Sequence, residues 1–274
     1  MISHLRTEWL KIKNYRAFIL ISIFFILGIF LTNYIVERVF REVVVNADAG
    51  VLIGQFNPYD FDHVWETVSY VSGYLLILPA LLLLIITTNE FTFKTSRQNI
   101  IDGWTRKEFI EVKLLMALIF AVLSTLIVLL SGFLFGSLSD TPFSTKGMMH
   151  VFYFFNKAFM YNVLALFISV WIRKTGFAIG IYFIYTGAEN IISQLLDALS
   201  VKWRNDEKMD LGRLGEYLPM NASDGLLSFP DNPLKSMAKN SFPTDLHYVE
   251  ISFSVFYLLL FIMLTRFLFL KRDL

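Results

Sequence analysis

The chain contains no cysteine, and Lys, Arg, Asp and Glu together supply only 17% of its 274 residues. The absence of cysteine excludes disulfides, thiolate metal sites and cysteine nucleophiles. A net charge of only +1 argues against a nucleic-acid-binding protein, which needs a dense positive surface to displace phosphate counterions. The hydrophobic content of 55% excludes intrinsic disorder.

The hydrophobic residues occur in long blocks, which are typical of membrane-spanning helices rather than of a water-facing core. A helix needs about 20 residues to cross roughly 30 Å of hydrocarbon. Suitable segments cover residues 17–36, 67–89, 114–139, 151–172, 175–196 and 251–270. The sequence therefore predicts an all-α membrane protein with six transmembrane helices in a single domain over residues 1–274.

The distribution of lysine and arginine predicts the orientation of these spans. Both residues are concentrated in the first sixteen positions, in the 90–113 connection, at 173–174 and in the C-terminal tail. Short basic segments are retained on the cytoplasmic side of a membrane. We therefore expect both termini in the cytoplasm. We also expect the chain to be a multi-pass protein of a bacterial plasma (inner) membrane.

The residues before the first span have helical amphipathicity. Ile2, Leu5, Trp9 and Ile12 share one face, whereas Arg6, Glu8 and Lys13 point elsewhere. This pattern predicts an N-terminal elbow helix that lies flat in the membrane interface. The alternative is a plain extension of the first span.

The two outer loops differ in composition. The first contains Asp60, Asp62, His63 and Glu66, which could hold a hard cation through their oxygens. Because no complete ligand set is present, we expect no metal there, but a solvated loop end with Phe61 and Trp65 at the interface. The second loop, residues 197–249, carries four of the seven prolines and predicts an ordered outer cap.

Two charged residues interrupt the predicted fourth and fifth spans. Lys157 and Glu189 lie at similar distances from the turn at 173–175, so their depths differ by only roughly 3–5 Å. Since that turn makes the two spans antiparallel neighbours, we predict an ion pair between them in the outer half of the membrane. The alternative is that each side chain snorkels to the outer surface.

Two glycine pairs have the four-residue spacing that allows helix backbones to approach closely. They are Gly132 with Gly136, and Gly176 with Gly180. We interpret both pairs as helix-packing positions.

The connection from Glu90 to Lys113 is longer than chain closure requires. Residues 97–101 can form a short helix that ends near Gly103, and Thr105 can cap a second helix, with Glu108 at the capping-box position. Trp104 and Phe109 are expected at the interface. Arg97, Arg106 and Lys107 then remain available to a cytoplasmic partner.

These features resemble the permease subunit of ATP-binding-cassette exporters of the type-2 permease family. The matching residues are Glu90, Thr95, Arg97, Gln98, Asn99, Gly103, Thr105, Arg106 and Lys113. The resemblance implies that the 90–113 segment holds a coupling helix that contacts the nucleotide-binding subunit, with Trp104 and Lys107 in the same surface. The alternative is an ordinary basic inner loop.

The resemblance also implies the function and the partners. The chain lacks a phosphate-binding loop, so ATP and Mg²⁺ are expected in a separate ATPase subunit, present in two copies. The chain itself would be no enzyme and would carry no cofactor. A second permease copy, identical or different, would complete a pathway for an amphipathic or hydrophobic substrate such as a lipid, peptide or antibiotic. A membrane-embedded enzyme and a motor-independent secondary transporter or channel remain the alternatives.

Overall fold

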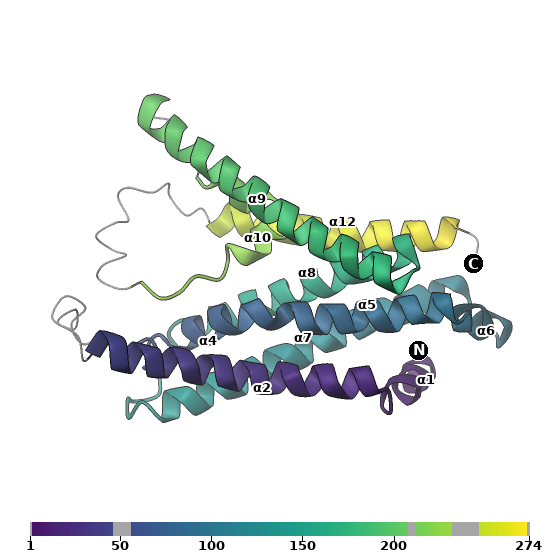
Figure 1. Cartoon of the computed structure of the whole chain (residues 1–274), viewed down its shortest axis with the longest axis horizontal. Coiled ribbons are helices and arrows are strands. Elements are labelled where there is room, and N and C mark those ends of the chain that lie inside the picture. The colour runs from purple at the N-terminus through teal and green to yellow at the C-terminus, as the bar shows by residue number, and fades with distance from the viewer. Residues whose placement is uncertain (1, 46–55, 208–211, 232–246, 273–274) are drawn as a thin grey trace.

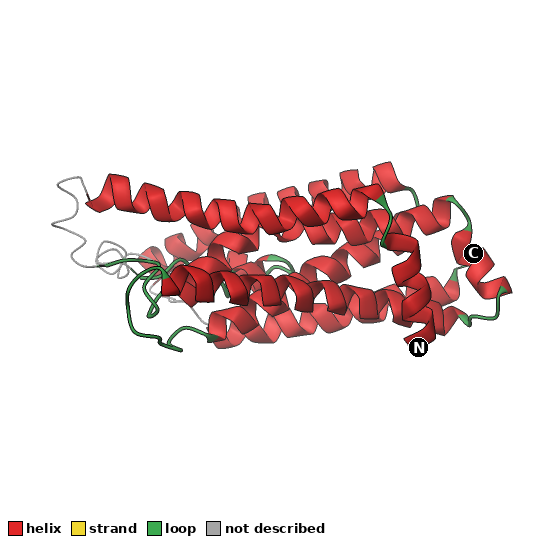
Figure 2. Ribbon diagram, turned by 90° about the horizontal axis from the view of Figure 1, so that it is seen from below, coloured by secondary structure: helices red, strands yellow, loops and turns green. Residues whose placement is uncertain are grey.

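The computed structural model describes residues 2–45, 56–207, 212–231 and 247–272, which form an elongated bundle of helices (Figure 1). The described residues include no strand, which confirms the all-α prediction. Two short helices, α1 (Ile2–Ile12) and α6 (Thr95–Ile101), lie at one end of the bundle. We call this end the α6 end and the opposite one the far end. Figure 2 shows that α1, beside the N mark, runs across the axis of the long helices.

The long helices run back and forth between the two ends. In chain order they are α2 (Arg16–Val39) with the π-helical turn η1 (Phe40–Val45), α4 (Val64–Gly73) with η2 (Tyr74–Leu76) and α5 (Ile77–Thr92), α7 (Arg106–Ser137), α8 (Met149–Ile172), α9 (Thr175–Glu207) and α12 (His247–Lys271). The 3-10 turn η2 precedes Pro79, whose missing N–H and bulky ring disfavour regular α-helical bonding there. The N and C marks in Figure 1 both lie at the α6 end.

Five of these helical segments have the length and composition needed to cross a membrane. They cover Arg16–Glu42, Val64–Thr92, Arg106–Ser137, Met149–Ile172 and Tyr248–Lys271. They coincide with five of the six predicted spans. The remaining prediction, at 175–196, falls in α9, a 33-residue helix that is not among the five. This helix also continues past the predicted boundary into the region expected to form the outer cap.

The rest of the predicted outer cap is only partly described. After α9, the chain forms the 3-10 helix η3 (Leu214–Tyr217) and the short helix α10 (Asn221–Asp224). Both pack against α12, and α10 also contacts α8 and α9. Pro233 and Pro243, which helped to predict the cap, lie outside the described residues.

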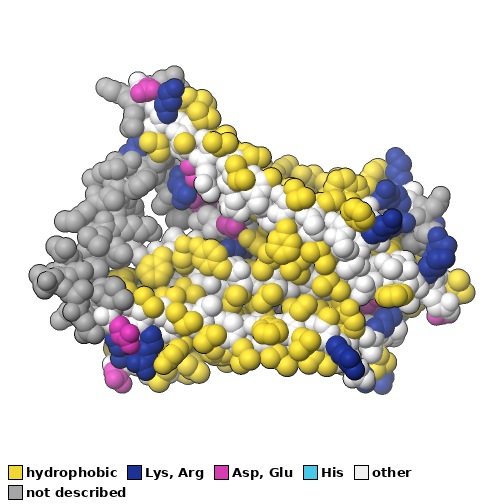
Figure 3. All heavy atoms as spheres, in the orientation of Figure 1, with side chains coloured by type: hydrophobic (Ala, Val, Ile, Leu, Met, Phe, Trp, Pro, Cys, Tyr) yellow, Lys and Arg dark blue, Asp and Glu magenta, His cyan; other side chains and the backbone are white. Residues whose placement is uncertain are grey.

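Helix α8 forms the centre of the bundle and packs against α4, α5, α7, α9 and α12. Its residues Val163, Leu164 and Leu166 are fully enclosed with Leu83 and Leu84 of α5. Helix α2 lies at the edge and exposes large apolar side chains along its length. In Figure 3, apolar side chains cover the middle of the visible face, and most lysines and arginines lie toward its ends. This distribution suits a bundle surrounded by lipid.

The packing corrects the expectation for the first outer loop. Phe61 and Trp65 are buried, at 4% and 2% exposure, instead of lying at an interface. A Cβ atom at Gly132 would lie 2.9 Å from the Trp65 ring, and one at Gly136 would lie 2.5 Å from the Phe61 ring. These two glycines therefore accommodate aromatic rings rather than another helix backbone.

Candidate functional site

A buried network of charges joins four helices at the α6 end. Lys113 of α7 is fully enclosed, and its Nζ atom lies 2.5 Å from Glu8 Oε2 and 2.8 Å from Glu90 Oε1. Glu8 comes from α1, and Glu90 lies near the end of α5. Both carboxylates are also buried, at 1% and 6% exposure. The lysine can remain charged in this position because two carboxylates replace its hydration.

A second lysine completes the network. Lys11 Nζ lies 2.8 Å from Glu8 Oε1 and 3.3 Å from both Glu90 Oε1 and Asn99 Oδ1. Two cations therefore balance two carboxylates, and Asn99 brings α6 into the same network. The ion pairs therefore join α1, α5 and α7, and a displacement of α6 relative to them would break the charge-assisted hydrogen bond between Lys11 and Asn99.

The network sets the protonation of Glu8. Burial by itself raises the pKa of this carboxyl, but attraction to Lys113 and Lys11 and the hydrogen bonds from both outweigh burial. The pKa of Glu8 therefore lies below the ordinary glutamate value. Glu8 is consequently ionised at neutral pH and holds both lysines.

Helix α6 lies between two turns that the neighbouring residues form. Lys94 has a left-handed conformation, with φ of 58°, directly before α6, and Gly103 follows the helix with φ of 103°. Thr105 then accepts a hydrogen bond from the Glu108 N–H, and the Glu108 carboxylate accepts one from the Thr105 N–H. This capping box starts α7, so the expected order of short helix, glycine turn and capped helix is confirmed.

The surface of α6 has one buried and one exposed side. Ser96 and Asn99 are buried against the bundle, whereas Arg97 and Gln98 are exposed and Ile101 is 77% exposed. Gln98 donates a hydrogen bond to Asp102 across one helical turn. Arg97, Gln98 and Ile101 thus point away from the bundle, while Asn99 on the opposite side joins α6 to Lys11.

Arginines from other segments extend this basic face. Burial lowers the pKa of Arg173, in the α8–α9 turn, and repulsion from Arg272, Arg97 and Arg106 lowers it further. Arg106 donates to the carbonyl of Arg272, and Arg272 donates to the carbonyl of Trp171. The four arginines come from α6, the start of α7, the α8–α9 turn and the tail. The four side chains therefore lie near one another and make the α6 end basic.

The remaining residues predicted for this surface have different environments. Lys107 is 66% exposed and lies 4.0 Å from Glu111, which also pairs with Arg266. Trp104 packs under α1, with its ring centroid 4.2 Å from that of His4. Phe109 is fully buried and stacks on Phe269, so its expected interfacial position is wrong.

The structure has the predicted helix before the first span, while its position in a membrane interface stays a prediction. Of the predicted apolar face, Trp9 is 53% exposed and Ile12 is buried in the protein, and Glu8, expected to point elsewhere, is also buried. The sequence signal for the charged network was the three-residue spacing of Glu8 and Lys11 on a short amphipathic helix. Their inward orientation could not be inferred, because Lys113, the partner of Glu8, and Glu90, the partner of Lys11, lie on distant segments.

The intramembrane charges also differ from expectation. Lys157 lies 3.3 Å from Asp224, which also accepts a hydrogen bond from the Tyr161 hydroxyl. Glu189 accepts hydrogen bonds from the Met220 and Asn221 N–H groups. The predicted direct pair is therefore replaced by separate contacts of each residue with the segment around α10. The α10 segment contacts both α8 and α9. The prediction considered only the depth of each charge along its span and did not include this segment.

The other predicted features have simpler environments. A Cβ atom added at Gly176 or Gly180 would meet no other segment within 4 Å, and the two glycines line a hollow of about 300 Å³ with Phe177, Ile181 and Ile184. Within the described part of the chain, no group of three acidic or histidine residues could hold a metal ion. In the first outer loop, burial raises the pKa of Asp60, which accepts a hydrogen bond from Asn57.

Comparison with known protein families gives a match over most of the chain. A family model with the description "Protein of unknown function (DUF2705)" matches residues 47–274. No curated protein matches the chain.

Proposed function

The chain belongs to the DUF2705 family, and we propose that it is the transmembrane subunit of an ATP-binding-cassette exporter. In this proposal, the α6 end faces the cytoplasm, both termini are cytoplasmic, and α9 crosses the membrane as the sixth span. The buried Lys113 network is the observation that carries the proposal, because it joins the ends of α1, α5 and α7 directly beside α6, and Lys11 connects Asn99 of α6 to it.

A rigid α6 suits the transmission of force. Closure of an ATPase around nucleotide would displace the exposed face of α6. The hydrogen bond from Lys11 to Asn99, and the contacts of Lys11 and Lys113 with Glu90, would carry that displacement to α5 and α7. A rigid-body shift of packed helices is an established way of coupling two sites. A flexible loop would instead absorb the movement.

The ATPase partner would supply ATP, Mg²⁺ and hydrolysis. Its acidic surface would contact the four arginines described above. Two ATPase copies and a second permease copy would form the complete exporter, and the open hollow at Gly176 and Gly180 is a suitable contact for that second copy. The substrate would be amphipathic or hydrophobic and would move between the two copies by alternating access.

A secondary transporter that works without a motor is the second candidate. The pair of the buried Lys157 with the partly exposed Asp224 supports it, since a charged side chain within a membrane-length helix often marks an ion or proton pathway. The two candidates differ in whether a stoichiometric ATPase accompanies the chain.

Co-purification tests the proposal. We expect the tagged chain, extracted in mild detergent, to retain an ATPase subunit at equal stoichiometry. The double reversal Arg97→Glu with Arg106→Glu should remove most of that subunit. The matched control is Arg41→Glu with Lys146→Glu, which reverses two charges at the far end and should leave the complex intact. Loss of the ATPase in both variants, or in neither, would argue against docking at α6.

A further inference from the structure

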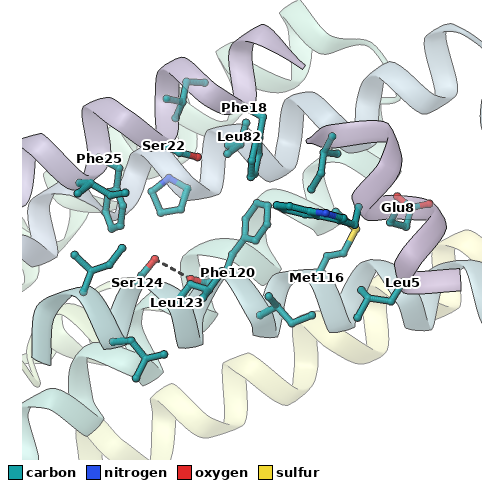
Figure 4. Close-up of a pocket in the computed structure, with 18 of the residues that line it drawn as sticks. Leu5, Glu8, Phe18, Ser22, Phe25, Leu82, Met116, Phe120, Leu123 and Ser124 are labelled. Atoms are coloured by element: carbon teal, nitrogen blue, oxygen red, sulfur yellow. Dashed lines mark hydrogen bonds between the residues drawn. The ribbon is translucent and has the colours of Figure 1, made fainter. Parts of the chain in front are cut away.

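An apolar cleft of about 570 Å³ lies between α1, α2, α5 and α7 (Figure 4). Phe18 of α2 and Phe120 of α7 point toward one another across it, with their ring centroids 6.4 Å apart. Ser22 and Phe25 extend its α2 wall, and Leu123 extends its α7 wall. The volume is within the range of small-molecule sites, about 300–1,000 Å³.

The length of the cleft corresponds to one leaflet of a membrane. Its α2 wall runs from Phe18 to Ile26, a rise of about 12 Å, and its α7 wall runs from Met116 to Leu130, a rise of about 21 Å. Half of the hydrocarbon core measures about 15 Å. Because the cleft begins under α1 at the α6 end and stops partway along the bundle, it does not form a path across the membrane.

The cleft interior offers apolar contacts, whereas its edge is basic. Glu8 is the ionisable residue in the lining, and it is bound to Lys113 and Lys11. Ser124 donates its hydroxyl hydrogen to the Phe120 carbonyl. Lys13, just after α1, and Arg16, the first residue of α2, are exposed between the lining residues Ile12 and Phe18.

We propose that this cleft binds an acyl chain of an anionic phospholipid from the leaflet at the α6 end. The hydrocarbon chain would lie along the cleft against Phe18, Phe25 and Phe120, and the phosphate would lie near Lys13 and Arg16. Such an arrangement combines burial of apolar surface with charge attraction at headgroup depth. It depends on the helices being embedded in a membrane, but not on an ATPase or on transport.

Photolabelling tests this site directly. The purified chain would be reconstituted in phosphatidylcholine vesicles that contain phosphatidylglycerol with a diazirine in its acyl chain, and labelled residues would be mapped by mass spectrometry. We expect labels to concentrate on residues 18–26 and 116–130. Ser22→Phe should reduce labelling there several-fold by filling the cleft. Leu31→Phe, on an exposed part of α2 outside the cleft, should not.

A second pair of variants tests the headgroup. Replacing Lys13 and Arg16 by Gln should remove the preference for diazirine-bearing phosphatidylglycerol over the matching phosphatidylcholine probe. Arg41→Gln, at the far end of α2, should leave the preference unchanged. If Ser22→Phe does not give a monodisperse protein, Ile119→Trp fills the same cleft from α7.

Two results would overturn the proposal. The first is labelling spread evenly over all exposed faces of α2 and α7 and unaffected by the filling variants. The second is efficient disulfide dimerisation of a Leu123→Cys variant in membranes. The native chain has no cysteine, so such a dimer would show that a second copy covers the cleft.

Discussion

Lys113 is surrounded so completely that its charge depends on its protein partners rather than on water. Its ammonium group contacts Glu8 and Glu90 at 2.5 and 2.8 Å, and its side chain has no solvent exposure. In an apolar bundle, removal of one partner leaves the others as uncompensated buried charges. Substitutions in this network should therefore have non-additive effects on the free energy of unfolding.

Lys113→Met should reduce the free energy of unfolding by roughly 3–5 kcal/mol, because it leaves two buried carboxylates with Lys11 alone. Adding Glu8→Gln should recover part of this loss. Lys107→Met, at an exposed position on the same helix, should have little effect. Denaturation of the detergent-purified variants measures these differences. Equal effects of Lys113→Met and Lys107→Met would contradict the buried network.

The lowered pKa of Glu8 predicts a pH dependence. Because the folded pKa lies below the unfolded one, Glu8 contributes stability above the ordinary glutamate pKa of about 4.3. That contribution is lost as pH falls below this value and through the lowered folded pKa. The Tm advantage of the native chain over Glu8→Gln should therefore shrink between neutral pH and about pH 3. A constant difference over this range would be inconsistent with an ionised Glu8.

At the scale of elements, the sequence predicted the features that depend on neighbouring residues better than those that depend on contacts between distant segments. The Thr105 capping box and the Gly103 turn were predictable because their determinants lie within a few residues. The five apolar helices followed from length and composition. The burial of Glu8 and the contact between Lys157 and Asp224 were not predictable, because each depends on segments that are far apart in the chain.

The two glycine pairs should respond differently to a methyl group. Gly136→Ala should destabilise the chain by about 1–3 kcal/mol, since its Cβ would lie 2.5 Å from the buried Phe61 ring. Gly180→Ala has open space and should be neutral or slightly stabilising through helix propensity. Thermal unfolding of both variants checks this contrast. Similar losses at both positions would show that Gly180 is also enclosed.

The position of α9 predicts the accessibility of its two ends. Figure 1 shows this helix running from the α6 end toward the far end. In a cysteine-free background, Lys174→Cys and Lys202→Cys should react with an impermeant maleimide from opposite sides of the membrane. Labelling of both from the same side of sealed vesicles would show that α9 is not a sixth span.

At the scale of the whole molecule, the two ends of the bundle have different structures. The α6 end combines a rigid charged network with an exposed basic face, and the far end encloses Lys157 and Glu189 with the segment around α10. Apolar helices separate the two ends. In the proposed exporter, the α6 end would receive force at one membrane surface, and the far end would change its packing toward the other.

Photo-crosslinking from α6 in living cells tests the proposed function most directly. A photoreactive amino acid would replace Gln98, which is exposed beside Arg97, and a matched variant would carry it at Lys146 on the far end. We expect position 98 to crosslink to a cytosolic subunit with a nucleotide-binding cassette and position 146 not to do so. The absence of such a subunit among the position-98 products, or labelling of that position from outside the cell, would contradict an ATP-driven permease.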